Sequence, residues 1–147
     1  MHGVRGAGAG GAGKRTPSPR LAVLLLGHGS KAPGANEAMC RVAGELGERH
    51  PGWIVESAFL EINHPSIPEG IGLCAGRGAE TIVLLPYFLH LGNHVARDLP
   101  RLMEEGQARH PGVEILLGPH LGFHEKLVEI VQERLAEALR PLPTGVC

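Results

Sequence analysis

The sequence predicts an α/β protein built on a single doubly wound four-stranded parallel sheet with helices on both faces. Short apolar runs alternate four times with segments in which apolar residues recur at helical spacing. Strand–helix units repeated in this way form parallel strands joined by right-handed crossovers. A short internal sequence repeat supports this alternation, because "ERHPGW" (48–53) and "ARHPGV" (108–113) each join a predicted helix to a predicted strand. In both, the Pro-Gly pair ends the helix and turns the chain.

Four apolar runs are the predicted strands. The first, "LAVLLLG" (21–27), is continuously apolar and ends in glycine, which is typical of a strand covered on both faces. The other three are the runs at 53–61, 80–88 and 113–119. Together they supply the sheet.

Four segments following these strands have apolar residues at helical spacing: 34–50, 66–78, 95–110 and 124–139. Asn36 is a candidate cap for the first helix. Pro68 falls in the first turn of the second, where proline is tolerated. Pro100 predicts an irregularity in the third. The segment 124–139 has the clearest amphipathic pattern of the four.

Length and composition limit the domain organisation and the partners. The chain has 147 residues, which suits one domain over 21–140. A Gly/Ala-rich tail over 1–20 precedes it and is expected to be disordered, because it cannot bury a core. Net charge is -1 with histidine neutral, and aromatic residues make up 3% of the chain. Neither a nucleic-acid partner nor an anionic membrane surface is expected from this balance.

The cysteines and the apolar runs predict a cytoplasmic protein. Cys40, Cys74 and Cys147 are odd in number and form no CxxC motif, so a disulfide framework is not expected. No apolar run approaches the ~20 residues of a membrane span. The basic residues before Leu21–Leu26 imitate a signal peptide, but that run is shorter than an export signal needs.

Histidine is unusually frequent, with nine in the chain. His50 and His110 precede predicted strands and are expected at helix ends, where the helix dipole favours them. His2 lies in the tail. The remaining six all follow predicted strands, at the edge where parallel α/β sheets bind ligands: His28, His64, His90, His94, His120 and His124. This gathering predicts a metal-binding or proton-transfer site.

Strand order decides which histidines meet. Doubly wound sheets of this length commonly run 2-1-3-4, which makes the tips of the first and third strands neighbours. His28 and the loop carrying His90 and His94 are then the leading candidates. Gly29 and Gly92 beside them allow close backbone approach to a ligand. Neutral imidazole suits divalent metals such as Co²⁺, Ni²⁺, Fe²⁺ and Zn²⁺.

Other site classes fit the sequence less well. "GHGS" around Ser30 lacks the GxSxG pattern of a nucleophile elbow, and no HExxH motif is present. The cysteines are misplaced for a structural zinc site. An open site lined by histidines is the remaining prediction.

Three loop segments resemble one known family when taken together. They are "LLLGHGSKAPGAN" (24–36), "AFLEINHPSIPEGI" (58–71) and "LLPYFLHLGNHVARDLP" (84–100). In this order they resemble the short-form sirohydrochlorin chelatases, the CbiX type of class II chelatase. "LGPHLGFHEKLVEIVQERL" (117–135) is similar to the family's fourth strand and final helix. The resemblance implies a chelatase-like half-domain.

The resemblance implies that a divalent metal, with Co²⁺ favoured, is inserted into sirohydrochlorin, a carboxylate-rich tetrapyrrole, in cobalamin biosynthesis. His28 and His94 match the family's two metal-binding histidines, and both are expected to bind the metal and accept pyrrole protons. Glu61, at the end of the second strand, is expected to assist them, and a solvated strand-end carboxylate is the alternative for this residue. No organic cofactor is expected, and the short forms of the family pair as homodimers.

The carboxylates of such a substrate require hydrogen-bond donors or cations. The candidates in or beside the key loops are Ser30, Lys31, His90, Asn93 and Arg97. For each of them, an ordinary surface role remains open. Asn93 is also a candidate helix cap.

Several functions remain open on the sequence alone. Iron insertion would serve siroheme synthesis, and nickel insertion would serve coenzyme F430 synthesis, because imidazole does not choose among these metals. A histidine-based metal carrier without enzymatic activity is a further alternative, although it does not explain glycine-bounded loops at one sheet edge. A flavodoxin-like binder would need a Ser/Thr-rich phosphate loop, where this chain offers only Ser30.

Overall fold

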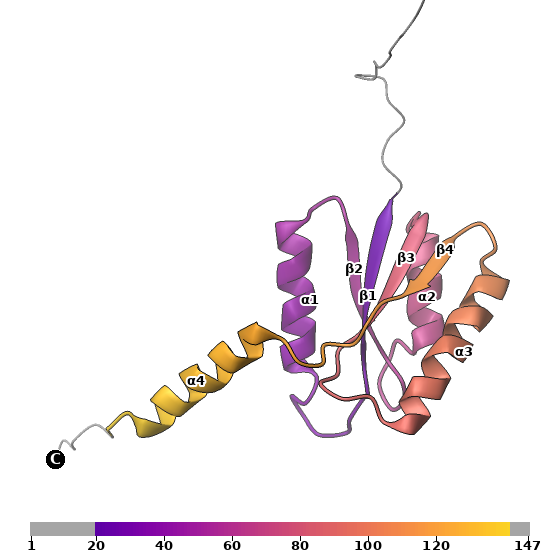
Figure 1. The fold of residues 1–147 in the computed structure, drawn as a ribbon. Coiled ribbons are helices and arrows are strands. Elements are labelled where there is room, and N and C mark those ends of the chain that lie inside the picture. Colours follow the sequence, from indigo (N-terminus) through magenta and orange to yellow (C-terminus); the bar gives the residue numbers. More distant parts are fainter. Residues whose placement is uncertain (1–19, 142–147) are drawn as a thin grey trace, which may run out of the picture.

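The computed structural model of the protein describes residues 20–141. The tail predicted over 1–20 therefore lies, apart from Arg20, outside the described residues, as does Cys147. The described chain alternates four strands with four helices, in the order expected from the sequence (Figure 1).

All four strands are parallel and form one sheet in the order β2-β1-β3-β4, as predicted. Their bounds are β1 Leu21–Gly27, β2 Ile54–Phe59, β3 Thr81–Pro86 and β4 Glu114–Leu117. β1 lies at the centre and pairs along its length with β2 on one side and β3 on the other. The strand with the most continuous apolar run thus occupies the position that is covered on both faces.

Alternate residues of β1 point into two separate cores. Ala22, Leu24 and Leu26 join the larger core, which includes buried residues of α2 (Ile67–Gly76) and Leu99 of α3 (Asn93–Arg109). Leu25 faces the other side. There it joins a smaller core with Met39 and Ala43 of α1 (Glu37–Arg49) and with Phe59. Helices therefore cover both faces of the sheet, as predicted.

The starts of the helices differ in part from the sequence predictions. Asn36 precedes α1, but its side chain makes no capping hydrogen bond, so the predicted cap is wrong. Gly92, rather than Asn93, is the residue before α3, and that helix has no side-chain cap. α2 begins with a capping box in which Ser66 and Glu69 exchange hydrogen bonds. Pro100 lies inside α3, which runs on past it to Arg109.

His50 and His110 end α1 and α3 at the edge opposite the carboxyl ends of the strands, as predicted. After each, the chain turns through the same hydrogen bond. Trp53 N donates to His50 O at 2.9 Å, and Val113 N donates to His110 O at 3.0 Å. The imidazole of His50 also stacks on Trp53, with ring centroids 3.7 Å apart. These two histidines have structural roles. The internal sequence repeat corresponds to two equivalent turns, each from a helix to a strand.

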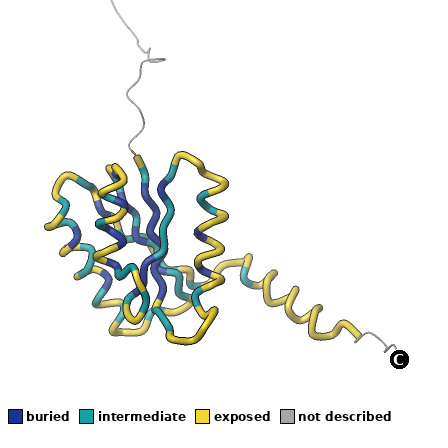
Figure 2. Tube along the Cα trace, turned by 180° about the vertical axis from the view of Figure 1, so that it is seen from behind, coloured by how far each residue is buried: buried dark blue, intermediate teal, exposed yellow. Residues whose placement is uncertain are grey.

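The last helix, α4 (Glu125–Leu139), departs from the expected packing on the sheet. It extends away from the sheet, beyond α1, and has no buried residue (Figure 1). Figure 2 shows it exposed along nearly its whole length. The connecting chain is held elsewhere, because Gly118 N donates to Leu84 O and both Leu121 N and Gly122 N donate to Phe88 O. These bonds direct the connection along the carboxyl ends of the strands.

Within residues 20–141, the helices lack the combination of length and apolar composition that a membrane span requires.

Leu24→Ala is expected to lower the free energy of unfolding by about 3 kcal/mol, measured by urea denaturation. Leu24 is fully buried, and α2 packs closely against it. A Cβ added at Gly70 would lie 3.1 Å from the Leu24 methyl groups. Leu73→Ala is the control, because that side chain is 51% exposed, and its effect should stay within about 0.5 kcal/mol. Equal losses in both variants would contradict this assignment of the core.

Candidate active site

The tip of β1 depends on a glycine. Gly29 follows His28 and has φ +102°, a conformation that other residues rarely adopt. A Cβ at Gly29 would lie 1.9 Å from the carbonyl oxygen of Glu61. Only glycine therefore allows the loop after β1 to approach the loop after β2 so closely.

His28 and Glu61 meet at this approach. Nε2 of His28 lies 3.2 Å from Oε2 of Glu61. The backbone continues the pairing of the two strands to the same point, because Glu61 N donates to His28 O at 3.1 Å. Both side chains are more than half exposed, so the pair contributes little to stability. An open imidazole–carboxylate pair can accept protons or contribute two ligands to a divalent metal.

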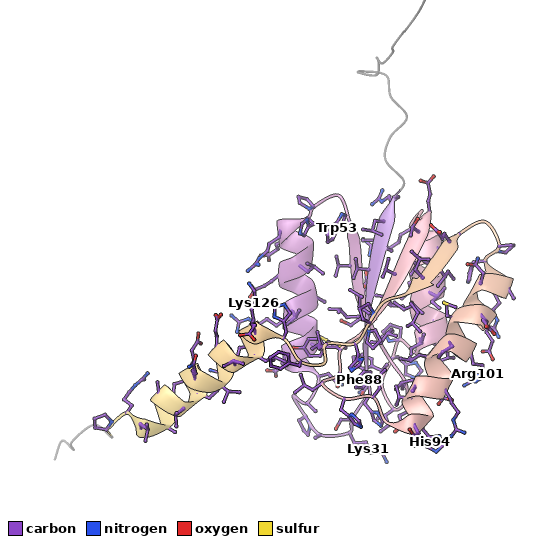
Figure 3. All side chains as sticks on the ribbon, in the orientation of Figure 1. Lys31, Trp53, Phe88, His94, Arg101 and Lys126 are labelled. Atoms are coloured by element: carbon purple, nitrogen blue, oxygen red, sulfur yellow. The ribbon has the colours of Figure 1, made fainter. Side chains whose placement is uncertain are left out.

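Phe88, in the loop after β3, packs beside the pair. The edge of one ring faces the plane of the other, with the centroids of His28 and Phe88 6.4 Å apart. Figure 3 shows Phe88, Lys31 and His94 at the end of the sheet opposite Trp53. Sequence reasoning did not assign Phe88. The only available signal was an aromatic residue at the carboxyl end of the predicted strand 80–88.

The predicted residues of the third loop lie on the same side of the fold. Asn93 and His94 are the first two residues of α3, Arg97 lies one turn further on, and all three are exposed. His90 is exposed in the preceding loop. Within residues 20–141, however, no three His, Cys, Asp or Glu side chains converge closely enough to hold a metal ion. The structure brings together His28 and Glu61 but does not complete a three-ligand site with His94.

Ser30 and Lys31 occupy the loop after β1. The Ser30 hydroxyl oxygen accepts a hydrogen bond from Ala32 N at 3.0 Å, and its backbone N–H donates to Oδ1 of Asn63 at 2.7 Å. Lys31 is exposed at the same edge (Figure 3). Asn63 was not identified from the sequence. An asparagine in a loop gives no sign of which distant backbone it will bind.

The roles of the remaining edge histidines also become visible. Nδ1 of His64 lies 2.8 Å from Oε1 of Glu69, whose carboxylate belongs to the capping box of α2. Nδ1 of His124 accepts from Lys126 N and caps α4. His120 lies in the connection between β4 and α4, half-buried. His64 and His124 thus make local structural contacts.

The fold and the residues at the carboxyl ends of the strands together define the class of this protein. It is an open parallel α/β protein whose strand tips present groups suited to a divalent cation and to proton transfer. The chain belongs to the CbiX family, whose family model matches residues 22–138.

Relatives of two lengths are similar to the chain. One, named sirohydrochlorin cobaltochelatase, from Priestia megaterium, is 36% identical over 124 residues, covering 84% of this chain and 40% of the relative. Another of the same name, from Methanococcoides burtonii, is 31% identical over 130 residues, covering 83% of this chain and 99% of the relative. The chain therefore spans less than half of the first relative and nearly all of the second.

A solved structure of a longer protein is also similar to this chain. The sirohydrochlorin chelatase SirB from Bacillus subtilis subspecies spizizenii, determined in complex with cobalt, has a TM-score of 0.70 and 28% sequence identity. The match covers 80% of this chain and 50% of SirB. The unit described here thus corresponds in size to half of SirB.

His64→Ala is expected to raise the pKa of Glu69 toward its ordinary value. The hydrogen bond from His64 is the largest cause of the lowered pKa of this carboxyl group, followed by the bond from the Ser66 backbone. Because the folded-state pKa is lowered, the stabilisation is present above the ordinary value and is lost as the pH falls through the folded value. A carbon-detected NMR titration of Glu69 measures the shift.

His50→Ala serves as the control, since that imidazole stacks on Trp53 at the far edge and should leave the Glu69 titration unchanged. An unchanged pKa of Glu69 in His64→Ala would show that the contact does not persist in solution.

Proposed function

We propose that this protein inserts a divalent metal, Co²⁺ in the first place, into sirohydrochlorin in the course of cobalamin biosynthesis. The observation that carries the proposal is the open His28–Glu61 pair, which lies at the edge where such sheets bind ligands. Relatives over most of the chain are named for this reaction.

The reaction requires two things of the protein. Two protons must leave the pyrrole nitrogens, and a partly desolvated cation must reach the centre of the ring. His28 can accept a proton at Nε2, and Glu61 can hold it at Oε2 3.2 Å away, so one proton can pass between them toward solvent. The same two atoms can instead hold the incoming metal until the ring nitrogens replace them.

His94 is proposed as the further metal ligand. It stands in the first turn of α3, just after the loop that follows β3, and β3 is a neighbour of β1. Because His94 is exposed, its imidazole is free to approach a metal held by His28 and Glu61 when the substrate binds. Borderline divalent metals accept imidazole and carboxylate ligands together.

Carboxylates of the tetrapyrrole are proposed to bind around this centre. Lys31 and Arg97 supply charge, while Ser30, Asn93 and His90 supply hydrogen-bond donors. Arginine suits carboxylates because its planar group donates two parallel hydrogen bonds. Phe88 adds an apolar surface for the macrocycle beside His28.

His28→Ala is expected to lower kcat for Co²⁺ insertion by at least about a hundredfold, because it removes a proton acceptor and a ligand together. His94→Ala and Glu61→Gln should each cause a loss of at least tenfold. Anaerobic mixing of protein, sirohydrochlorin and Co²⁺ allows insertion to be followed by tetrapyrrole absorbance, against a reaction without protein. His110→Ala is the matched control, since that histidine ends α3 at the opposite edge.

Repeating the assay with Fe²⁺ and Ni²⁺ tests the choice of metal, and with it the alternatives of siroheme and coenzyme F430 synthesis. Co²⁺ should give the highest kcat/KM. A folded protein that binds Co²⁺ but accelerates insertion of none of the three metals would be a metal carrier, and the chelatase proposal would be abandoned.

We further propose that residues 21–140 act as a single domain, that the protein works in the cytoplasm without an organic cofactor, and that it pairs as a homodimer.

The surface of α4 supports the formation of a homodimer. Four of its exposed apolar side chains recur along one side of the helix: Val128, Val131, Leu135 and Leu139. Such a stripe requires an apolar surface to cover it.

The same chain leaves one such surface open. On the α1 face, Val83 and Leu85 of β3 are only half-buried and Leu116 of β4 is 44% exposed. Next to them, a groove of about 820 Å³ separates α1 from Tyr87. In a dimer, the uncovered helix of each copy can pack on the uncovered sheet face of the other copy. A two-fold interface requires this reciprocal fit. SirB, of which this chain covers half, supports the presence of a second unit.

Val131→Glu combined with Leu135→Glu is expected to weaken dimerisation at least about a hundredfold, because burial of each side chain is worth ~1.5–3 kcal/mol. Sedimentation equilibrium measures the dimer Kd. Lys126→Glu combined with Ala136→Glu is the control, since neither position belongs to the row formed by Val128, Val131, Leu135 and Leu139. A monomeric wild type at every concentration would overturn the homodimer.

A further inference from the structure

The side chain of Asn63 joins two loops of the proposed site. Its Oδ1 accepts the backbone N–H of Ser30 at 2.7 Å and Nδ2 of Asn36 at 3.0 Å. Both donors belong to the loop between β1 and α1, whereas Asn63 belongs to the loop between β2 and α2. One oxygen atom therefore connects the loop that carries His28 to the loop that carries Glu61.

This junction lies where the strand pairing ends. The two loops are paired through their backbones as far as the bond from Glu61 N to His28 O. Beyond that point the backbone turns at Gly29, which has φ +102°. The N–H of Ser30, the residue after it, then bonds to the Asn63 side chain instead of to a backbone group of the neighbouring loop. The asparagine thus extends the contact between the loops past the last backbone pair.

The backbone between Glu61 and Asn63 is strained. Ile62 has φ 72°, which is unfavourable for a β-branched residue. Asn63 N donates to Glu61 O at 2.7 Å, so the three residues form a γ-turn of the rare type with positive φ. Ile62 is 50% exposed, so burial of its side chain does not hold the turn. Strain of this kind persists only where surrounding contacts fix it.

We propose that Asn63 is a positioning residue, whose side-chain oxygen fixes the strained turn at Ile62 and the loop after β1 so that Glu61 and His28 face one another. This inference rests on the proposed metal insertion. It adds a residue that itself touches neither the metal nor the reacting nitrogens. Without the Asn63 oxygen, the Ser30 N–H and the Asn36 amide lose their acceptor, and the turn at Ile62 is free to relax.

Asn63→Ala is expected to lower kcat for Co²⁺ insertion at least tenfold while KM for sirohydrochlorin stays within about threefold, because a small displacement of a reacting group slows the chemical step. Asn63→Asp keeps an acceptor oxygen at the same position and should recover kcat to within about threefold of wild type. Amide hydrogen exchange at Ser30 gives an independent readout. Protection should be lost in Asn63→Ala and kept in Asn63→Asp.

Gln107→Ala is the matched control. The Gln107 side chain also connects separate backbone groups, accepting from Ile115 N and donating to Val113 O, but near the start of β4 and far from the strand tips. It should lower stability without changing kcat or Ser30 exchange. If Asn63→Ala does not fold, Asn36→Ala removes one of the two donors and should give a smaller loss of kcat in the same direction.

The outcomes separate the two proposals. Wild-type activity together with an unchanged kcat in folded Asn63→Ala would overturn the positioning role, as would equal losses in Asn63→Ala and Asn63→Asp. Absence of insertion by the wild type would overturn the proposed function instead. In that case Ser30 exchange still decides whether Asn63 holds the loop.

Discussion

The pairing of β1 along both of its edges is the constraint on which the rest of the structure depends. Ala22 to Leu26 pair with β2 on one side and β3 on the other, and their side chains alternate between two cores. Because the three strands run parallel and in register, their carboxyl ends finish at one edge. The loops carrying His28, Glu61 and His94 are thereby brought to that edge from positions far apart in the chain.

Local backbone geometry then sets how closely these loops meet. Gly29 permits the contact with the carbonyl of Glu61, and the positive φ of Ile62 turns the second loop back toward the first. Such conformations are unfavourable in isolation, and folded structure must hold them. The site therefore draws its geometry from the sheet and its two loop contacts, whereas its exposed charges contribute little to stability.

The two faces of the sheet are unequally covered. α2 and α3 bury the larger core, while α1 alone covers the other face with a core of four buried residues. α4 does not pack on the sheet, and the connection that precedes it is bonded to Leu84 and Phe88. The position of α4 leaves both its own apolar side chains and part of this sheet face uncovered, and the proposed second copy would cover both.

By itself the sequence determined the strands, the helices, their order and the edge at which the histidines gather, because apolar periodicity and the turn residues are local properties. It also indicated the family, because the motifs that are typical of the family are contiguous in the chain. Only the tertiary structure decided that Asn36 binds Asn63 instead of capping α1, that Phe88 packs on His28, and that α4 leaves the sheet. These depend on contacts between residues distant in the chain, and local sequence patterns do not encode the partner of a side chain across such distances.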